Sequence, residues 1–423
     1  MTLTVRLAAI ARCRVPNVLV AIVVTLLCMH GSRPLNLGGT VAAQMPNRSI
    51  LRAIHLSSIP FAVVADQQTS RVFVVTASSS TNQGGVTVLN ATSGTVIHTT
   101  PLGIMSRDGI SDDILDGRII ALDTRSGRVF VLSAGPLPAD YSSQGRGHVY
   151  MLDARSGRLL RDTRVGIGPS VILVDPSVNR AYVGTRSRNG ESLQLDIIDA
   201  TTGRLLNTVK TSVAPLAASG GVVLTNGGEV LDGRTGAVRH TVATAGGIGE
   251  AVVDERRGRA VLGESGRRPD IYVETVDVRT GRVIHSDYLQ DGDPEIPLVA
   301  DPTTGHVLVY VEPVDQVSAA PGFASVRDTR SGKEIWSGQV SLTPVQFASA
   351  VGTVNPVTNH FLLVTPETSV DIVHIIDARA PRILGSLRVG SGSPTIAVDA
   401  ASRRVFVATT GDRTVRVLDA ARL

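Results

Sequence analysis

The sequence predicts an all-β fold made of repeated four-stranded sheets, and three observations carry that prediction. The first is composition: glycine is abundant at 42 residues, aromatic residues make up only 3%, and the apolar residues are mostly Val, Leu, Ile and Ala. This composition suits many short strands joined by tight turns. The other two are sequence signatures that alternate from residue 50 to the end of the chain. We therefore expect almost no helix.

The first signature is an apolar strand closed by Asp or Asn, four turn residues, and then Arg or His opening a second apolar strand. The constant spacing indicates a hairpin, because the two strands must turn through the same loop each time. The pairs are Asp66/Arg71, Asp123/Arg128, Asp175/Arg180, Asp254/Arg259, Asp301/His306, Asn355/His360 and Asp399/Arg404.

The second signature is a pair of apolar residues ending in Asp or Asn, followed in most copies by a Ser/Thr-Gly turn and another apolar strand. Glycine accepts the positive φ that such a turn needs, and the acid can accept a backbone N–H two residues on. Asn does the same without a charge, so we interpret these acids as turn residues and not as catalysts. They are Asn90, Asp153, Asp199, Asp232, Asp277, Asp328, Asp377 and Asp419.

Each pair of signatures gives four strands, which we name a, b, c and d in order, and there are eight such modules. Module four is compressed, with Gly220–Thr225 as strand b and Glu229–Leu231 as strand c. The last module ends at Leu423 without a strand d, whereas Ile50–Leu56 is a strand with no a, b or c before it. We therefore predict a ring in which the N-terminal strand completes the C-terminal blade, because closure removes the free edges of an open array.

The last module resembles the YVTN-type β-propeller repeat in Ile396–Asp399, Arg404–Ala408 and Thr414–Asp419. The resemblance covers residues 50–423 and implies a propeller. Relatives of this kind include surface-layer, periplasmic and substrate-binding proteins and some enzymes, so the repeat alone implies no function. Most of them have seven blades, which is the alternative to eight here because module four is short.

Residues 1–43 differ from the rest of the chain, with four arginines, no acidic residue and an apolar run from Val15 to Met29. This is the composition of an export leader. It is either a signal peptide cleaved after the small residues Val41–Ala43 or an uncleaved membrane anchor. We predict a leader over 1–43, a single β-propeller domain over 44–423, and a secreted, periplasmic or cell-surface location.

The leader also accounts for the charge and the cysteines. The net charge of +4 equals the four arginines of residues 1–43, so the remainder is formally neutral. A neutral domain has no basic excess to release phosphate counterions, which argues against nucleic acid as a partner. Cys13 and Cys28 both lie in the leader, so the mature domain has no disulfide, thiolate metal site or cysteine nucleophile. Ring closure leaves few free edges, and we expect a monomer.

Binding is expected on one face of the ring. In propellers the b-to-c and d-to-a loops gather on one face around the central channel, which we call the loop face, and the a-to-b and c-to-d turns lie on the other, the turn face. Long, dissimilar loops on a regular scaffold favour binding. Here they are Thr76–Gly85, Ser133–Gly147, Thr185–Ser192, Glu264–Asp270 and Glu312–Phe323 between strands b and c, and Gly103–Gly117 and Gln290–Glu295 between modules.

Two of these loops are acidic, one before module two and one before module six, which are opposite each other in a ring of eight. We hypothesise that they hold a cation or a basic ligand at the channel mouth, and calcium fits because it prefers oxygen ligands. The alternative is that they are solvated loop carboxylates. The residues are Asp108, Asp112, Asp113 and Asp116 in the first loop, and Asp291, Asp293 and Glu295 in the second.

The histidines give no catalytic pattern. His98, His240 and His285 each fall four residues after a turn glycine, which indicates a repeated outer-strand position. His306 and His360 occupy the arginine position of the hairpin. A nucleophile–base pair or a metal site would need partners that the neighbouring sequence does not supply. The remaining candidates, interpreted as structural histidines, are His55, His148 and His374.

Motifs with a known mechanism are also missing. The sequence contains no Gly-x-Ser-x-Gly elbow, His-Glu-x-x-His motif, phosphate-binding loop or complete dinucleotide fingerprint. Asp328–Trp336 resembles the docking repeat of pyrroloquinoline-quinone dehydrogenases, but Trp336 is the only tryptophan. We assign no catalytic, cofactor-binding or metal-binding residue.

The sequence therefore favours an exported propeller that acts as a binding or scaffolding module for a protein, peptide or small-molecule ligand. It would contact a membrane only through an uncleaved leader. The alternative is a propeller enzyme, either a lactonase-like hydrolase or a quinoprotein relative, with a divalent metal at the channel. The two differ in whether carboxylates converge within ligand distance there.

Overall fold

The computed structural model describes residues 44, 47–81, 83–104, 118–133, 146–187, 192–211, 213–244, 246–265, 270–291, 298–311, 322–341, 350–367 and 369–423. All of them belong to one unit of the chain, Val41–Leu423. The leader predicted for residues 1–43 lies outside the described residues.

The first four blades follow the predicted order of strands a to d, from the innermost strand to the outermost. Blade 1 contains β2 (Ile59–Asp66), β3 (Arg71–Ala77), β4 (Gln83–Asn90) and β5 (Val96–Ile104). Blade 2 contains β6 (Ile120–Asp123), β7 (Arg128–Ser133), β8 (Arg146–Asp153) and the first part of β9 (Leu159–Asp175). Blade 3 contains the rest of β9, β10 (Arg180–Arg186), β11 (Leu193–Asp199) and β12 (Leu205–Thr211). Blade 4 contains β13 (Pro215–Ser219), β14 (Val222–Thr225), β15 (Glu229–Asp232) and β16 (Val238–Thr241).

The second four blades repeat the pattern. Blade 5 contains β17 (Gly247–Asp254), β18 (Arg259–Ser265), β19 (Asp270–Asp277) and β20 (Arg282–Asp291). Blade 6 contains β21 (Leu298–Asp301), β22 (His306–Val311), β23 (Gly322–Asp328) and β24 (Glu334–Ser341). Blade 7 contains β25 (Val351–Asn355), β26 (His360–Pro366), β27 (Asp371–Asp377) and β28 (Ile383–Gly390). Blade 8 contains β29 (Pro394–Asp399), β30 (Arg404–Thr409), β31 (Thr414–Asp419) and, as its outermost strand, β1 (Ile50–His55).

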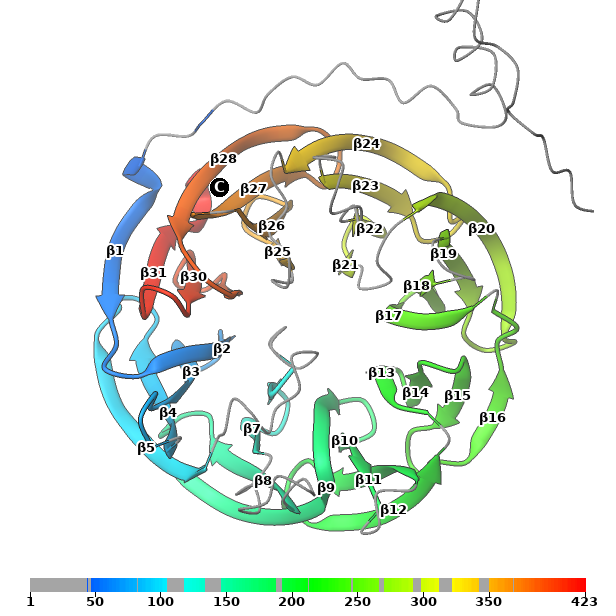
Figure 1. The fold of residues 1–423 in the computed structure, drawn as a ribbon, viewed down its shortest axis with the longest axis horizontal. Coiled ribbons are helices and arrows are strands. Elements are labelled where there is room, and N and C mark those ends of the chain that lie inside the picture. The colour runs from blue at the N-terminus through cyan, green and yellow to red at the C-terminus, as the bar shows by residue number, and fades with distance from the viewer. Residues whose placement is uncertain are drawn as a thin grey trace, which may run out of the picture. The chain divides into compact units, whose positions relative to one another are not determined.

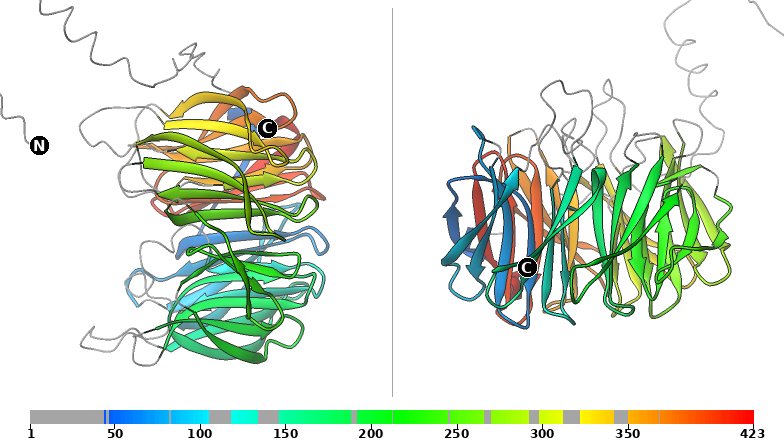
Figure 2. Two further views of the ribbon diagram at one scale, coloured as in Figure 1. Left: turned by 90° about the vertical axis from the view of Figure 1, so that its right-hand side faces the viewer. Right: turned by 90° about the horizontal axis from the view of Figure 1, so that it is seen from below.

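The fold is an eight-bladed β-propeller. The strands form six four-stranded sheets and one seven-stranded sheet, in which β9 is shared by blades 2 and 3. Each innermost strand contacts the next, in the cycle β2, β6, β9, β13, β17, β21, β25, β29 and back to β2. Figure 1 shows this ring, and the side views in Figure 2 show strands running between its two faces. The compressed module four is a full blade, which confirms eight and excludes seven.

The ring closes as the sequence predicts, through the pairing of β1 with β31. The two strands are antiparallel, with Ile50 opposite Leu418 and His55 opposite Thr414. Leu56 extends the contact by donating its backbone N–H to the Arg413 carbonyl at 2.9 Å. Figure 1 shows β1 lying along the outer side of β31. The first and last strands of the described chain therefore belong to one blade.

The apolar core lies between neighbouring blades. Blades stack face to face, so strands b and c are covered on both sides. Their sequences are therefore continuous apolar runs, without alternation of apolar and polar residues. The third residue of strand b is a fully buried aromatic in four blades, at Phe73, Phe130, Tyr182 and Phe406. The Tyr182 hydroxyl also donates to the Gly233 carbonyl of blade 4 at 2.8 Å. The seams between blades are thus the main source of burial.

Helix is nearly absent, as expected. In the described part of the chain the helical segments are two short 3₁₀ turns, η1 (Asn47–Ser49) and η4 (Ala420–Arg422). No helix among these residues is long and apolar enough to cross a membrane.

Ring closure can be tested on β1 itself. Ile54 is 9% exposed and packs with Val415 and Val417, whereas Leu51 on the same strand is 46% exposed. We expect Ile54→Ala to lower the free energy of unfolding by about 2–3 kcal/mol. Leu51→Ala should change it by less than about 0.5 kcal/mol. Chemical denaturation measures both, and equal effects would show that β1 does not seal the ring.

Candidate functional site

The predicted acidic loops lie almost wholly outside the described residues. Asp108, Asp112, Asp113, Asp116, Asp293 and Glu295 belong to segments that the structure does not describe. Asp291 is the last residue of β20, in register with Asp270. The strands that follow the two loops, β6 and β21, begin blades 2 and 6, four steps apart in the ring. That the clusters bind a ligand across the channel mouth stays a prediction.

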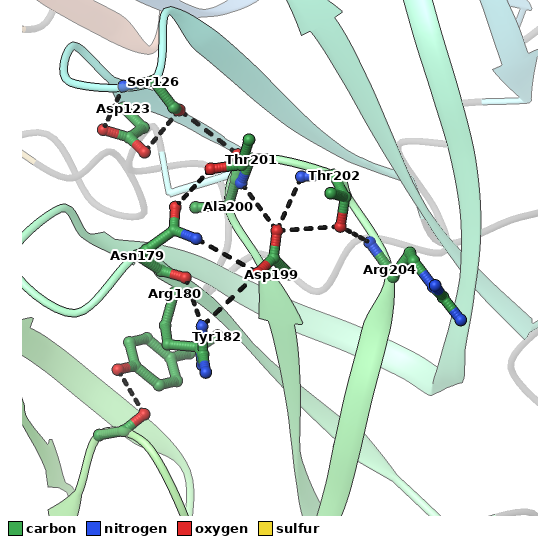
Figure 3. Close-up of polar contacts among 11 residues, drawn as sticks. Asp123, Ser126, Asn179, Arg180, Tyr182, Asp199, Ala200, Thr201, Thr202 and Arg204 are labelled. Atoms are coloured by element: carbon green, nitrogen blue, oxygen red, sulfur yellow. Dashed lines mark hydrogen bonds and ion pairs between the residues drawn. The ribbon is translucent and has the colours of Figure 1, made fainter.

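The turn acids have the structural role predicted for them. The Asp199 carboxylate accepts the backbone N–H groups of Thr201 and Thr202 at 3.1 and 2.8 Å, and Asn179 donates its side-chain amide to the same carboxylate. Figure 3 shows these bonds. Burial acts to raise the pKa of Asp199, but the hydrogen bonds from Thr202 and the nearby Arg180 lower it overall. The acid is ionised and fully used within the turn.

The a-to-b turn acids also connect neighbouring blades. Asp254 is 4% exposed and accepts the hydroxyl of Thr329, in the next blade, at 2.7 Å. Asp175 accepts the Gly221 backbone N–H of blade 4 at 2.7 Å. Where the acid is replaced by Asn355, the amide donates to the Ala420 carbonyl of blade 8 at 2.7 Å. These side chains therefore hold the ring together on the turn face.

The histidines that recur after the turn glycines lie at the seams between blades. A Cβ on Gly157 would lie 2.8 Å from the His98 ring of the preceding blade, and a Cβ on Gly281 would lie 2.7 Å from His240. The glycine is needed because the histidine packs against its backbone. His306 makes a different contact at its own seam, where its Nδ1–H donates to the Ala378 carbonyl at 2.6 Å. These residues are structural, as the sequence indicates.

An ion pair between blades 5 and 6, with a buried arginine and a partly exposed carboxylate, is not predicted by the sequence analysis. Arg327 in β23 is 1% exposed, and its guanidinium lies 2.6 Å from the Asp287 carboxylate of β20 and 3.7 Å from Glu334. Its position, directly before the c-to-d acid, is apolar in the other blades. Burial acts to raise the pKa of Asp287, but Arg327 lowers it overall, with help from His285. The pair is a structural contact within a seam.

This pair predicts a large loss of stability when one partner is removed. Asp287→Ala leaves the Arg327 cation buried without its nearest carboxylate, which should lower the free energy of unfolding by about 3 kcal/mol. The pair Arg239–Asp232, whose arginine is 46% exposed against 1% for Arg327, is the control, and Arg239→Ala should cost less than about 1 kcal/mol. Urea denaturation at neutral pH distinguishes the two. Equal small losses would mean that Arg327 gains another partner or reaches water.

A second set of buried titratable groups lies in blade 7. Asp371 is 1% exposed, and its Oδ2 has no hydrogen-bond partner within the part of the chain that the structure describes. Burial raises its pKa to about 7, with a further contribution from Asp412 that Arg416 opposes. Burial lowers the pKa of His374 to about 4, and its Nε2 lies 2.9 Å from the Thr365 hydroxyl. Both groups are neutral in the folded state between these two values.

The two groups make opposite contributions to stability as pH changes. Because the folded-state pKa of Asp371 is raised, its contribution to the free energy of unfolding falls as pH rises from about 4 to about 7. Because the folded-state pKa of His374 is lowered, its contribution to the free energy of unfolding grows as pH rises from about 4 to 6.5. We expect Asp371→Asn to leave the His374 effect unopposed, so that stability rises more between pH 4.5 and 6.5 than in the wild type. Denaturation at both pH values measures this, and an unchanged difference would contradict it.

An ion pair joins blades 2 and 5 across the middle of the ring. Arg118, just before β6, forms an ion pair with Glu250 of β17. Their blades, 2 and 5, are three steps apart in the ring, so the side chains can meet only across its centre. The two side chains are 21% and 20% exposed. The centre of the ring is therefore bridged here by opposite charges.

A pocket lies at the seam between blades 2 and 3. It has a volume of about 380 Å³, within the usual range for small-molecule sites of about 300–1,000 Å³. Arg146 at the start of β8 and Arg186 at the end of β10 place it at the loop face, where strands c begin and strands b end. Arg164 of β9 is the third cation. We call this feature the arginine pocket.

Its far wall comes from blade 3. Asp196 of β11 is 2% exposed and accepts from the Gly166 N–H at 2.8 Å and from the hydroxyls of Thr185 and Thr208. Gly166 lies so close to β10 that a Cβ would be 2.8 Å from the Arg186 carbonyl oxygen. These contacts fix β9 at the point where it changes from the outermost strand of blade 2 to the innermost strand of blade 3.

Asp196 belongs to a layer of buried polar residues that sequence reasoning missed. The layer uses two repeat positions, five residues after the Arg or His that opens strand b and three before the c-to-d acid. Polar residues that recur at these offsets within apolar strands are the sequence signal that indicates this layer. The buried members at these offsets include Thr76, Thr87, Ser133, Thr185, Asp196, Glu264, Glu274, Ser325, Thr365, His374 and Thr409.

The described residues form no cluster of metal-ligating side chains. Within the described ranges, no group of three or more His, Cys, Asp or Glu side chains could hold a metal ion.

Comparison with known proteins agrees on the fold and gives no family. No family model matches the sequence, and no curated protein matches it. Hydrazine synthase of Kuenenia stuttgartiensis is similar with a TM-score of 0.52 and 13% identity, over 86% of this chain and 97% of that one. The Dos1 propeller is similar with a TM-score of 0.59 and 12% identity, over 88% of this chain and 94% of that one. Such low identities show the β-propeller fold alone, and the YVTN-type assignment stays a prediction.

Proposed function

We propose that this propeller, built from YVTN-type repeats, is an exported binding or scaffolding module whose ligand contacts the loop face. The observation that carries the proposal is the difference between the two faces of the ring. On one face the acids and hydroxyls build the same turns and seam contacts in blade after blade, whereas the loops of the other face differ in length and content. Dissimilar loops on a rigid frame are suited to recognition.

The acids and hydroxyls of the turn face are used to build its turns and seams. Its acids accept backbone N–H groups within their own turns, as Asp232 does from Arg234 and Thr235. Its hydroxyls bond across the seams, as Thr69 does to the Ala154 carbonyl at 3.1 Å. Since the same bonds recur from blade to blade, this face is uniform.

The loop face is irregular and charged. The b-to-c loops that begin and end there differ in length and content. The arginine pocket lies at the base of two of them, Ser133–Gly147 and Thr185–Ser192. The acidic loops around Asp108 and Asp293 belong to the same face by the propeller rule, and we propose that they hold calcium or a basic ligand.

No observation on the described residues favours the enzymatic alternative, so we propose no reaction. We also propose that the protein acts outside the cytoplasm as a monomer, either released from its leader or held to a membrane by it. Its partner is a protein, peptide or small molecule and not a nucleic acid, because residues 44–423 carry no basic excess.

A ligand panel on the full chain tests the choice of face. The probes are calcium chloride, oligolysine, citrate and pyrophosphate, read by melting temperature and by hydrogen exchange. A ligand at 100 times its Kd adds about 2.7 kcal/mol of stability. We expect at least one probe to raise the melting temperature and to slow exchange at loop-face segments such as Leu193–Leu195. No shift with any probe, or protection confined to turns such as Arg125–Arg128, would overturn the proposal.

A further inference from the structure

We propose that the arginine pocket is a binding site for a small molecule that carries two or more oxyanion groups, either carboxylates or phosphates. This inference rests on the proposal that the loop face is the binding face, and it names the ligand class there.

The register spreads the positive charge across the pocket. Arg146 on β8 and Arg186 on β10 are both in register with Ile167 on β9, one from each side. Neighbouring strands lie about 4.8 Å apart, so the two backbones are about 10 Å apart, and residues directly opposite project to the same face of a sheet. Arg164 lines the same pocket three residues before Ile167. A ligand with two separated anionic groups matches this spacing better than a single small ion.

The three guanidinium groups have no partner among the described residues. Elsewhere in the ring, some arginines at strand ends pair with turn acids, as Arg259 does with Asp277 at 2.5 Å and Arg128 with Asp153 at 3.3 Å. The guanidinium groups of Arg146, Arg164 and Arg186 make no hydrogen bond or ion pair to any group that the structure describes. With Asp196 as the one carboxylate, the lining carries three positive charges and one negative, a net charge of +2 that attracts an anion.

The one carboxylate in the pocket, Asp196, forms no ion pair with the three arginines and offsets only one of their charges. Asp196 is buried behind β9, where Gly166, Thr185 and Thr208 already donate to its oxygens. It fixes the pocket wall and leaves the guanidinium groups to an incoming ligand. Guanidinium groups suit carboxylate and phosphate because they form paired, charge-assisted hydrogen bonds to both.

The remaining lining favours an organic molecule over a bare inorganic ion. Val165, Ile167 and Leu205 give apolar surface, and Gln194 adds an amide that can donate or accept. The volume of about 380 Å³ accommodates a small metabolite. The continuous strand β9 and the close contact of Gly166 hold the walls in place before a ligand arrives, which reduces the ordering cost of binding.

Calorimetry on the full chain tests the site with defined probes. Citrate represents polycarboxylates, pyrophosphate represents phosphates, and acetate is the monovalent reference, all at low ionic strength. We expect citrate, pyrophosphate or both to bind, more tightly than acetate and more weakly as salt is added. The double variant R146Q/R186Q should lose at least about tenfold in affinity, because each removes charge-assisted hydrogen bonds.

A matched control separates a site from a general charge effect. R155Q/R158Q removes two exposed arginines from the c-to-d turn of blade 2, on the turn face, and should leave affinity within about twofold. Melting temperatures without ligand confirm that both variants fold. The proposal is overturned if neither citrate nor pyrophosphate binds the wild type, or if both variants lose the same affinity. If neither citrate nor pyrophosphate binds but calcium or oligolysine protects the loop face, this site is overturned while the proposed function stands. If citrate or pyrophosphate protects the turn face instead, both fall.

Discussion

The structure depends on the antiparallel pairing of β1 with β31. Blades bury their apolar faces against one another, so an open row of eight would leave one face uncovered at each end. The uncovered faces would be those of blade 1, with Val72 and Val74, and of blade 8, with Phe406. By supplying the outer strand of blade 8, β1 fixes the two ends of the row together, and its Ile54 joins the cluster that those two faces make. Closure therefore comes from one strand contributed from far away in the sequence.

In the closed ring the two faces differ, because the turn face repeats the same residue types in each blade and the loop face does not. On the turn face the same residue types carry out two tasks in each blade, forming the turn and bonding to the next blade. Asp175 illustrates both, since it accepts from Ser177 within its turn and from Gly221 across the seam. A face built this way cannot vary without weakening the seams. The loop face is under no such restriction, and that is where the arginine pocket lies.

Much of the fold could be predicted because its causes are local or repeated. The constant spacing of turn acids, and the pairing of an orphan N-terminal strand with an incomplete last module, are both visible in the sequence. The seam contacts could not be predicted in the same way. In the sequence Arg327 is a charged residue within an apolar strand. Only the stacking of blades places it beside Asp287, 40 residues earlier. The arginine pocket is similar, because Arg146 and Arg186 meet only through their shared register with Ile167. The acidic clusters chosen from the sequence are conspicuous because their members are neighbours in the chain, whereas a pocket is assembled from residues that are not.

The continuous strand β9 makes blades 2 and 3 inseparable in a sense that applies to no other neighbouring pair in the described chain. Elsewhere in the ring, one blade ends and the next begins with a separate strand, so a chain break or an inserted domain between them would leave both sheets intact. Between blades 2 and 3 the same backbone is the outer edge of one sheet and the inner edge of the other, from Leu159 to Asp175. Any circular permutation or domain insertion at that junction would cut through both sheets at once. Engineering of this ring should therefore treat the two blades as one piece.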